Sequence, residues 1–259
     1  MEKGAEAVAT KNTKATVDGL RAVELNYRSI RDISSGQTAF LQTRTMLNSP
    51  NLGVLTPDIY RDVAEMTNQA DQLFRLELIQ ALEANNTFYE REINFNWLSV
   101  YLPVRLLREK RTIRFASDYA ARYQVPTSRI CFELSEKLLT ENDEQVPVTI
   151  QSMRNLGFHF MLTNFGGTSC PMMRLSDYPV DFVMLSPEVA NYIGRGERSD
   201  NAVRSIISFV NDIGSEPVAD GVFNSHQAEM LYSFECSYCA GNLSGKYMTE
   251  RYIKRKSDS

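Results

Sequence analysis

The stretch ELNYRSIRDISSGQTAFLQTRTML, which spans residues 24–47, holds two β-rich runs separated by a short polar segment. The runs are Glu24–Ile33 and Thr38–Leu47. Between them, Ser34-Ser35-Gly36-Gln37 has the small, polar composition of a hairpin connection. We therefore predict that this part of the chain forms two antiparallel strands.

Downstream of the hairpin, β-rich runs alternate with stretches of helical period. The strands predicted there are Ile93–Val100, Arg129–Leu134, His159–Leu162, Phe182–Leu185 and Glu216–Ala219. The helices predicted are Ile59–Met66, Leu73–Leu82, Val104–Tyr123, Val146–Asn155, Val203–Ile213 and Gln227–Phe234. Such alternation indicates parallel strands covered by helices, and this many repeats in one domain-sized chain favour a closed barrel. The fold class that we predict is α/β: a (β/α)8-like barrel whose first strand is antiparallel to its neighbours.

Composition narrows the class of protein further. The chain has 259 residues, a net charge of -4 and 43% hydrophobic residues, which is enough for one large domain with a full core. The mild acidity argues against a nucleic-acid partner, and the basic end Arg251–Lys256 is interpreted as a solvated tail. No apolar run reaches the roughly 18 residues that a membrane-spanning helix needs. Residues 1–22 are predicted to be a linker or N-terminal extension, and residues 23–259 the barrel.

The four cysteines bear on the compartment of the protein. They are too few for a disulfide framework in a chain of this length, so we expect a reducing, cytoplasmic location. The spacing of Cys236 and Cys239 is that of half a zinc or redox site, but without a second pair we interpret them as two half-buried thiols beside the last barrel strand.

Function in such barrels sits at the carboxyl ends of the strands. Short polar motifs follow several of the predicted strands. They are Glu133-Leu134-Ser135-Glu136, Thr163-Asn164-Phe165-Gly166, Met184-Leu185-Ser186 and Ala219-Asp220-Gly221-Val222.

In this order, the motifs resemble those of the EAL domain family of cyclic di-GMP phosphodiesterases. The family has E-[IL]-[ST]-E, then D-D-F-G, then a strand ending K-x-D, then A-E-G-V. The separations also fit, because Glu133 lies 30 positions before Thr163, and Asp220 lies 36 after Met184 and 20 before Ala240. The resemblance covers about residues 25 to 250. It implies a TIM-like barrel with a reversed first strand, and active members bind two Mg²⁺ or Mn²⁺ ions that activate water for attack on a phosphodiester.

Most metal-ligand positions of the family carry other residue types in this chain. The signature Glu-Ala-Leu falls on Gln42-Thr43-Arg44, and the ligand asparagine falls on Tyr101. The paired aspartates fall on Thr163 and Asn164, and only Glu133 is an unchanged ligand. Because Mg²⁺ depends on carboxylate oxygens, we expect no metal cofactor here.

The remaining pocket positions differ as well. The lysine that helps to hold the attacking water falls on Met184, and the glutamate of A-E-G-V is shortened to Asp220. A guanine-binding glutamine falls on Ala240, and a phosphate-binding arginine falls on Met46. Glu136 matches a glutamate that anchors a loop in active members.

These departures predict a pseudoenzyme rather than a working phosphodiesterase. The first hypothesis is a non-catalytic signalling domain that binds a protein partner, not identified by the sequence, in cyclic di-GMP-related regulation. The alternatives are a receptor that binds cyclic di-GMP without cleaving it, and a residual phosphodiesterase. A homodimer is also expected, through the segment Phe165–Leu175 with its apolar Cys170, Met172 and Met173. The chain could also be one domain of a longer protein.

Overall fold

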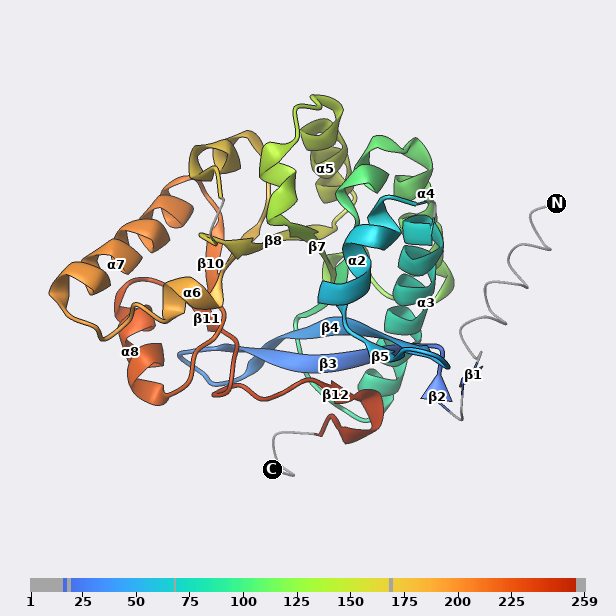
Figure 1. Cartoon of the computed structure of the whole chain (residues 1–259), viewed down its shortest axis with the longest axis horizontal. Coiled ribbons are helices and arrows are strands. Elements are labelled where there is room, and N and C mark those ends of the chain that lie inside the picture. Colours follow the sequence, from blue (N-terminus) through green and yellow to red (C-terminus); the bar gives the residue numbers. More distant parts are fainter. Residues whose placement is uncertain (1–15, 18–19, 68, 168–169, 255–259) are drawn as a thin grey trace.

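A computed structural model describes residues 16–17, 20–67, 69–167 and 170–254 (Figure 1). Most of the predicted N-terminal extension lies outside these residues. The part that is described contains β1 (Thr16–Val17) and β2 (Leu20–Arg21), which pair antiparallel with one another.

Eight strands close into one barrel. In spatial order they are β3 (Val23–Asp32), β4 (Thr38–Ser49), β6 (Trp97–Tyr101), β7 (Ile130–Ser135), β8 (His159–Phe165), β9 (Phe182–Leu185), β10 (Glu216–Ala219) and β11 (Tyr238–Cys239). β3 is antiparallel to both of its neighbours, β4 and β11, and every other neighbouring pair in the barrel is parallel. The predicted barrel with a reversed first strand is therefore confirmed.

The hairpin that reverses the first strand is held by its own turn residues. The Asp32 carboxylate accepts hydrogen bonds from the hydroxyls of Ser34 (2.7 Å) and Ser35 (2.9 Å) and from the Ser35 backbone N–H (2.7 Å). Gly36 adopts φ +63° and donates its N–H to the Asp32 carbonyl oxygen at 2.9 Å. This left-handed conformation favours glycine, so the sequence of the turn specifies the hairpin.

Two short strands extend the sheet beside the hairpin. β5 (Gly53–Leu55) pairs antiparallel with the end of β4, and β12 (Met248–Thr249) pairs antiparallel with β3. Neither strand was predicted, because runs of two or three residues carry no detectable period.

Helices cover the outside of the barrel. They are α2 (Pro57–Glu65), α3 (Gln69–Glu90), α4 (Lys110–Arg122), α5 (Gln145–Asn155), α6 (Pro187–Ala190), α7 (Glu197–Asp212) and α8 (Ser225–Ser233). Short 3-10 helices occupy Val104–Arg108, Thr127–Arg129, Glu136–Thr140, Met172–Asp177 and Glu250–Tyr252. No helix in the described part of the chain is long and apolar enough to cross a membrane.

The single helix predicted over Val104–Tyr123 is wrong. The chain forms the 3-10 helix Val104–Arg108, breaks at Glu109 (φ -103°, ψ 111°) and then begins α4. The Thr112 hydroxyl donates to the Leu106 carbonyl oxygen at 2.7 Å and stabilises this bend. Leu106 and Leu107, just before the break, are both buried in the core.

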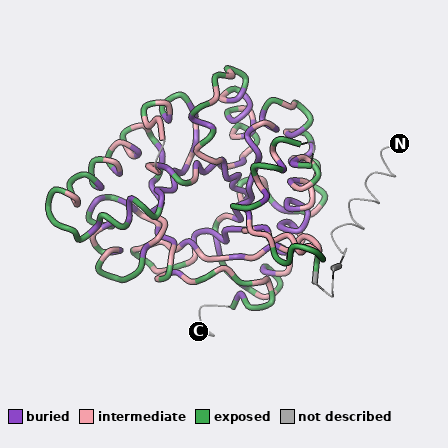
Figure 2. Tube along the Cα trace, in the orientation of Figure 1, coloured by how far each residue is buried: buried purple, intermediate pink, exposed green. Residues whose placement is uncertain are grey.

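The core has an inner and an outer part (Figure 2). Between strands and helices lies a large apolar layer that includes Phe132, Leu162 and Ile207. Inside the barrel, Phe40 packs edge-on against Phe182 at 4.9 Å between ring centroids and closes the interior. The open space is therefore left at the other end, where the parallel strands finish.

Candidate functional site

A cavity of about 370 Å³ opens at the carboxyl ends of the parallel strands, where the sequence predicted the site. Its walls come from most of the barrel strands, from α2 and from the segment before β12. The lining residues are Arg28, Gln42, Thr43, Arg44, Pro57, Asp58, Arg61, Glu133, Thr163, Asn164, Met184, Leu185, Ser186, Pro187, Asp220 and Tyr247.

Arg28 lines this cavity and makes charged contacts across it. Its side chain is only 12% exposed, and it binds both carboxylate oxygens of Asp220 at 2.9 and 2.8 Å. Its Nε donates to Gln42 Oε1 at 2.6 Å. Burial disfavours the guanidinium charge, but the charge and hydrogen bonds of Asp220 act against this effect, and the pKa of Arg28 is raised. A two-pronged pair of this kind is both charged and geometrically defined. Arg28 is thus a fixed internal cation.

Glu133 is the second carboxylate of the cavity, and it is buried. It accepts a hydrogen bond from the Ser99 hydroxyl, whose strand β6 is the neighbour of β7. Desolvation raises the pKa of Glu133, although hydrogen bonds from Ser99 and Gln42 partly oppose the shift. Gln42 therefore lies between Arg28 and Glu133 and bonds to both.

Tyr247 covers the two arginines on the β3–β4 side of the cavity. Its hydroxyl donates to Gln42 Oε1 at 3.0 Å. The guanidinium carbons of Arg28 and Arg44 lie 4.8 and 5.5 Å from the ring centroid, which is within cation–π range. Burial raises the pKa of the Tyr247 phenol, so this group stays neutral.

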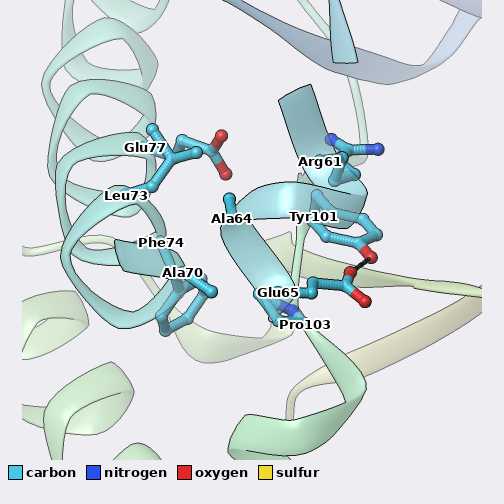
Figure 3. Close-up of a pocket in the computed structure, with 9 residues that line it drawn as sticks. All are labelled: Arg61, Ala64, Glu65, Ala70, Leu73, Phe74, Glu77, Tyr101 and Pro103. Atoms are coloured by element: carbon cyan, nitrogen blue, oxygen red, sulfur yellow. Dashed lines mark hydrogen bonds between the residues drawn. The ribbon is translucent and has the colours of Figure 1, made fainter. Parts of the chain in front are cut away.

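Helix α2 forms one wall and is fastened to the rim by Tyr101 (Figure 3). The Tyr101 hydroxyl donates to the Glu65 carboxylate, and the Arg61 guanidinium stacks on the Tyr101 ring at 3.5 Å. Behind this contact is a small cavity of about 10 Å³, which the buried Glu77 of α3 helps to line. Desolvation raises the pKa of Glu77 to about 7, with a smaller opposing effect of Arg61.

The structure brings six of the predicted pocket positions together around the cavity. They are Gln42, Glu133, Thr163, Asn164, Met184 and Asp220.

Three other predicted positions are not among the lining residues. Tyr101 faces α2 instead, and Ala240 is fully buried in the barrel interior with Met184. Met46 lies farther along β4, opposite Glu24 of β3. Glu136 accepts a hydrogen bond from Asn164 Nδ2 at 2.5 Å, so it contacts the loop after β8.

Sequence reasoning missed Arg28, Arg61 and Tyr247. For Arg28 a signal existed, since it is a charged residue in a β-rich run and lies directly opposite Gln42 in the hairpin register. For Tyr247 and Arg61 there was none, because their contacts are made between segments far apart in the chain.

Comparison with known proteins identifies the family. The model of the EAL domain matches residues 17–247 of this chain. The chain belongs to the EAL domain family. Among curated relatives of this EAL domain, the cyclic di-GMP phosphodiesterase RocR of Pseudomonas aeruginosa is 25% identical over 210 residues, which are 80% of this chain and 52% of RocR. The chain spans 36% to 52% of the length of RocR and of the uncharacterized protein Rv1354c of Mycobacterium tuberculosis, which it also matches.

Solved EAL structures share the fold. The PaMucR phosphodiesterase in complex with c-di-GMP superposes with a TM-score of 0.79 at 18% identity, covering 90% of this chain and 95% of that one. The FimX EAL domain from Pseudomonas aeruginosa bound to c-di-GMP gives a TM-score of 0.77 at 14% identity, covering 96% and 97%.

The residues at the mouth of this EAL domain do not fit a pair of divalent cations. The described residues include no cluster of three or more acidic, histidine or cysteine side chains placed to hold a metal ion. Both oxygens of Asp220 are engaged by Arg28. A divalent ion about 4 Å from that guanidinium would meet a repulsion of roughly 8 kcal/mol at an effective dielectric constant of 20.

Proposed function

We propose that this EAL domain does not turn over cyclic di-GMP and acts in cyclic di-GMP-related regulation by binding a protein partner. The observation that carries the proposal is the Arg28–Asp220 pair, since Arg28 engages both oxygens of a carboxylate that the family resemblance implies for metal binding. An arginine supplies charge but no exchangeable water to act as a nucleophile.

The neighbouring positions support the same proposal. Met184 faces the cavity where the resemblance implies a lysine, and its sulfur lies 3.8 Å from Gln42 Nε2. A thioether neither carries charge nor transfers a proton. The Thr163 hydroxyl donates a hydrogen bond to the Leu134 carbonyl oxygen at 3.2 Å. Met184 therefore cannot hold or deprotonate a water as a lysine or carboxylate can, and Thr163 lacks the negative charge that a cation-binding aspartate would supply.

The test is a turnover assay on cyclic di-GMP and on its linear product, with Mg²⁺ and with Mn²⁺. We expect rates equal to the no-protein control, and no difference between wild type and Glu133→Gln. Turnover that depends on Glu133 would refute the loss of catalysis.

A second candidate function is a receptor that binds cyclic di-GMP without hydrolysis. The observation that favours it is the set of three arginines at the cavity, Arg28, Arg44 and Arg61. Arg28 is committed to Asp220, and Arg44 is paired at 2.8 Å with Asp58, whose side chain is 80% exposed. Such an exposed ion pair is worth little, so Arg44 could exchange it for a phosphate.

Calorimetric titration of cyclic di-GMP, with and without Mg²⁺, separates the two candidates. Heat of binding that is independent of Mg²⁺ and is lost in Arg44→Ala would establish the receptor. Arg114→Ala on α4 is the matched control, because the Arg114 side chain is 82% exposed and outside the cavity lining. Absence of heat at high micromolar ligand would favour the partner-binding domain.

A further inference from the structure

Exposed apolar side chains are concentrated on β5 and α2. Of the fourteen large apolar side chains that are exposed in the described residues, five fall between Leu52 and Met66. They are Leu52, Val54, Ile59, Val63 and Met66, between 53% and 86% exposed. We call these five side chains the α2–β5 surface. Isolated exposed apolar residues are ordinary, but a group of this size indicates a contact site.

The periodicity of α2 explains why its apolar residues are on two sides. Pro57, Tyr60 and Ala64 are buried against the barrel and α3. Ile59, Val63 and Met66 follow at spacings of four and three, which places them together on the opposite face. A surface helix that packs on one side only has polar residues on its outer face. This outer face is apolar, so a second contact is built into the helix.

β5 adds an unpaired sheet edge to the same surface. Within the described residues β5 pairs only with β4, so its other edge is open. Only Thr56 separates β5 from α2 in the chain, and Figure 1 shows the two elements next to each other. Exposed edges are usually protected by charges or proline, whereas Leu52, Gly53, Val54 and Leu55 carry neither.

The charges beside the surface balance one another. Asp58 pairs with Arg44, and Asp62 pairs with Lys137. A rim with equal numbers of acids and bases does not select a strongly charged partner. It does not oppose a second copy of itself, because both acids are already paired within the chain and leave no like charges to repel one another. An edge strand likewise pairs antiparallel with its own copy across such an axis.

We propose that the α2–β5 surface is the interface of a homodimer, in which β5 and α2 of one chain contact β5 and α2 of a second. Five side chains offer on the order of 400 Å² of apolar surface per chain, and a standard interface buries roughly 800 Å² per partner. The β5 backbone and the charged rim supply the rest. The inference rests on the proposed function in one respect, namely that the domain acts through its surface.

This surface is different from the Phe165–Leu175 segment expected from the sequence. In that segment Cys170 and Met172 are partly buried and pack against the barrel's own core, while Met173 is 74% exposed. The two surfaces lie on different elements, so single substitutions separate them.

The experiment is light scattering during size-exclusion chromatography of the whole chain at micromolar concentration, over a tenfold dilution range. Wild type is expected at twice the 29.5 kDa chain mass. Val63→Glu is expected at the mass of one chain, which corresponds to a dissociation constant raised at least tenfold. Met173→Glu is the matched control and should remain a dimer. Circular dichroism of each variant checks that it is folded, which these exposed positions allow.

Cross-linking provides an independent measurement. Val54→Cys should give a disulfide-linked dimer on a non-reducing gel, and Tyr89→Cys, an exposed position on α3, should not. A wild-type monomer, a Val63→Glu dimer, or a Met173→Glu monomer would each overturn the proposal. Turnover of cyclic di-GMP by a dimer would refute the proposed function and leave this interface standing. A monomer without turnover would refute this interface and leave the proposed loss of catalysis standing.

Discussion

At the residue scale, the residue with the most charged contacts in the cavity of this EAL domain is Arg28. It joins β3 to the end of β10, 192 positions away, and also holds Gln42 on β4. One guanidinium therefore connects three strands across the open end of the barrel. Removing one partner of such a buried pair leaves the other charge uncompensated, which is costly.

We expect Arg28→Met to lower the free energy of unfolding by about 3 kcal/mol, because the Asp220 carboxylate would remain in the cavity without a cationic partner. The measurement is the midpoint of urea unfolding. Arg114→Met removes an exposed pair with Asp118 and should change stability by less than about 0.5 kcal/mol. In the double variant with Asp220→Asn, part of the loss should be recovered. Equal small effects of Arg28→Met and Arg114→Met would contradict the central role of Arg28.

Glu77 is a second residue whose burial has a measurable consequence. The residue is 2% exposed, and burial raises the pKa of its carboxyl to about 7 from an ordinary value of 4.5. The folded protein therefore keeps this proton to a higher pH than the unfolded chain does. Between about pH 4.5 and pH 7 the folded state binds more protons, so this carboxyl makes stability fall as pH rises, by up to about 3 kcal/mol.

Glu77→Gln should remove this contribution, since the amide is uncharged at every pH and retains an oxygen that can accept from Thr45. We expect the variant to be more stable than wild type at pH 8 and to differ from it less at pH 5. Urea unfolding at both pH values measures the difference. A stability difference that does not vary with pH would show that Glu77 ionises normally.

At the scale of elements, the loops that follow β10 and β11 are in direct backbone contact. Gly241, two residues after β11, has φ +132°, and a Cβ atom there would lie 2.5 Å from the Val222 nitrogen and 2.6 Å from its oxygen. The Val222 N–H also donates to the Ala240 carbonyl oxygen at 2.9 Å. This contact positions Asp220 for Arg28, because Asp220 is at the start of the same loop.

Gly241→Ala should destabilise the protein by about 3 kcal/mol or more, because backbone atoms cannot move aside as a side-chain tip can. Gly245→Ala is the control: Gly245 has φ +118°, but nothing lies within 4 Å of its Cβ position. Gly245→Ala should therefore lose only about 1 kcal/mol of stability, from backbone strain alone. Thermal melts of the two variants decide the matter, and a similar loss in both would rule out the steric explanation.

At the scale of the whole molecule, the barrel mouth is neutralised from within. Arg28, Arg44 and Arg61 face Asp58, Glu133 and Asp220 around one cavity, so its charges need no external ion for balance. A protein that binds a metal only in its folded state is stabilised by that metal. Because the barrel mouth of this protein already contains the Arg28 guanidinium, we expect its stability not to depend on a bound metal ion.

The melting temperature should therefore be the same in Mg²⁺ as in a chelator, to within about 1 °C at millimolar metal. Differential scanning calorimetry on wild type makes the measurement. The informative comparison is Arg28→Met, which frees both carboxylate oxygens of Asp220. A rise with Mg²⁺ in wild type would count directly against the Arg28 argument.

The sequence alone determined the barrel, the reversed first strand and the positions of the motifs at the strand ends. These follow from local information, because the turn chemistry of residues 34–37 and the alternation of periods are properties of neighbouring residues. The order and spacing of the motifs also indicated the EAL family before any contact was known. Six of the nine expected pocket positions line one cavity, since parallel strands of a barrel end on the same side.

Only the tertiary structure decided what those positions do together. A strand period tells which face a side chain is on, but not which side chain lies across the barrel from it. The contacts of Arg28 with Asp220 and of Tyr247 with Gln42 join segments 192 and 205 positions apart. The turning of Tyr101 toward α2, and the apolar outer face of that helix, depend on how the helix docks. Charge pairing and burial are properties of distances in space, and the closed barrel sets those distances.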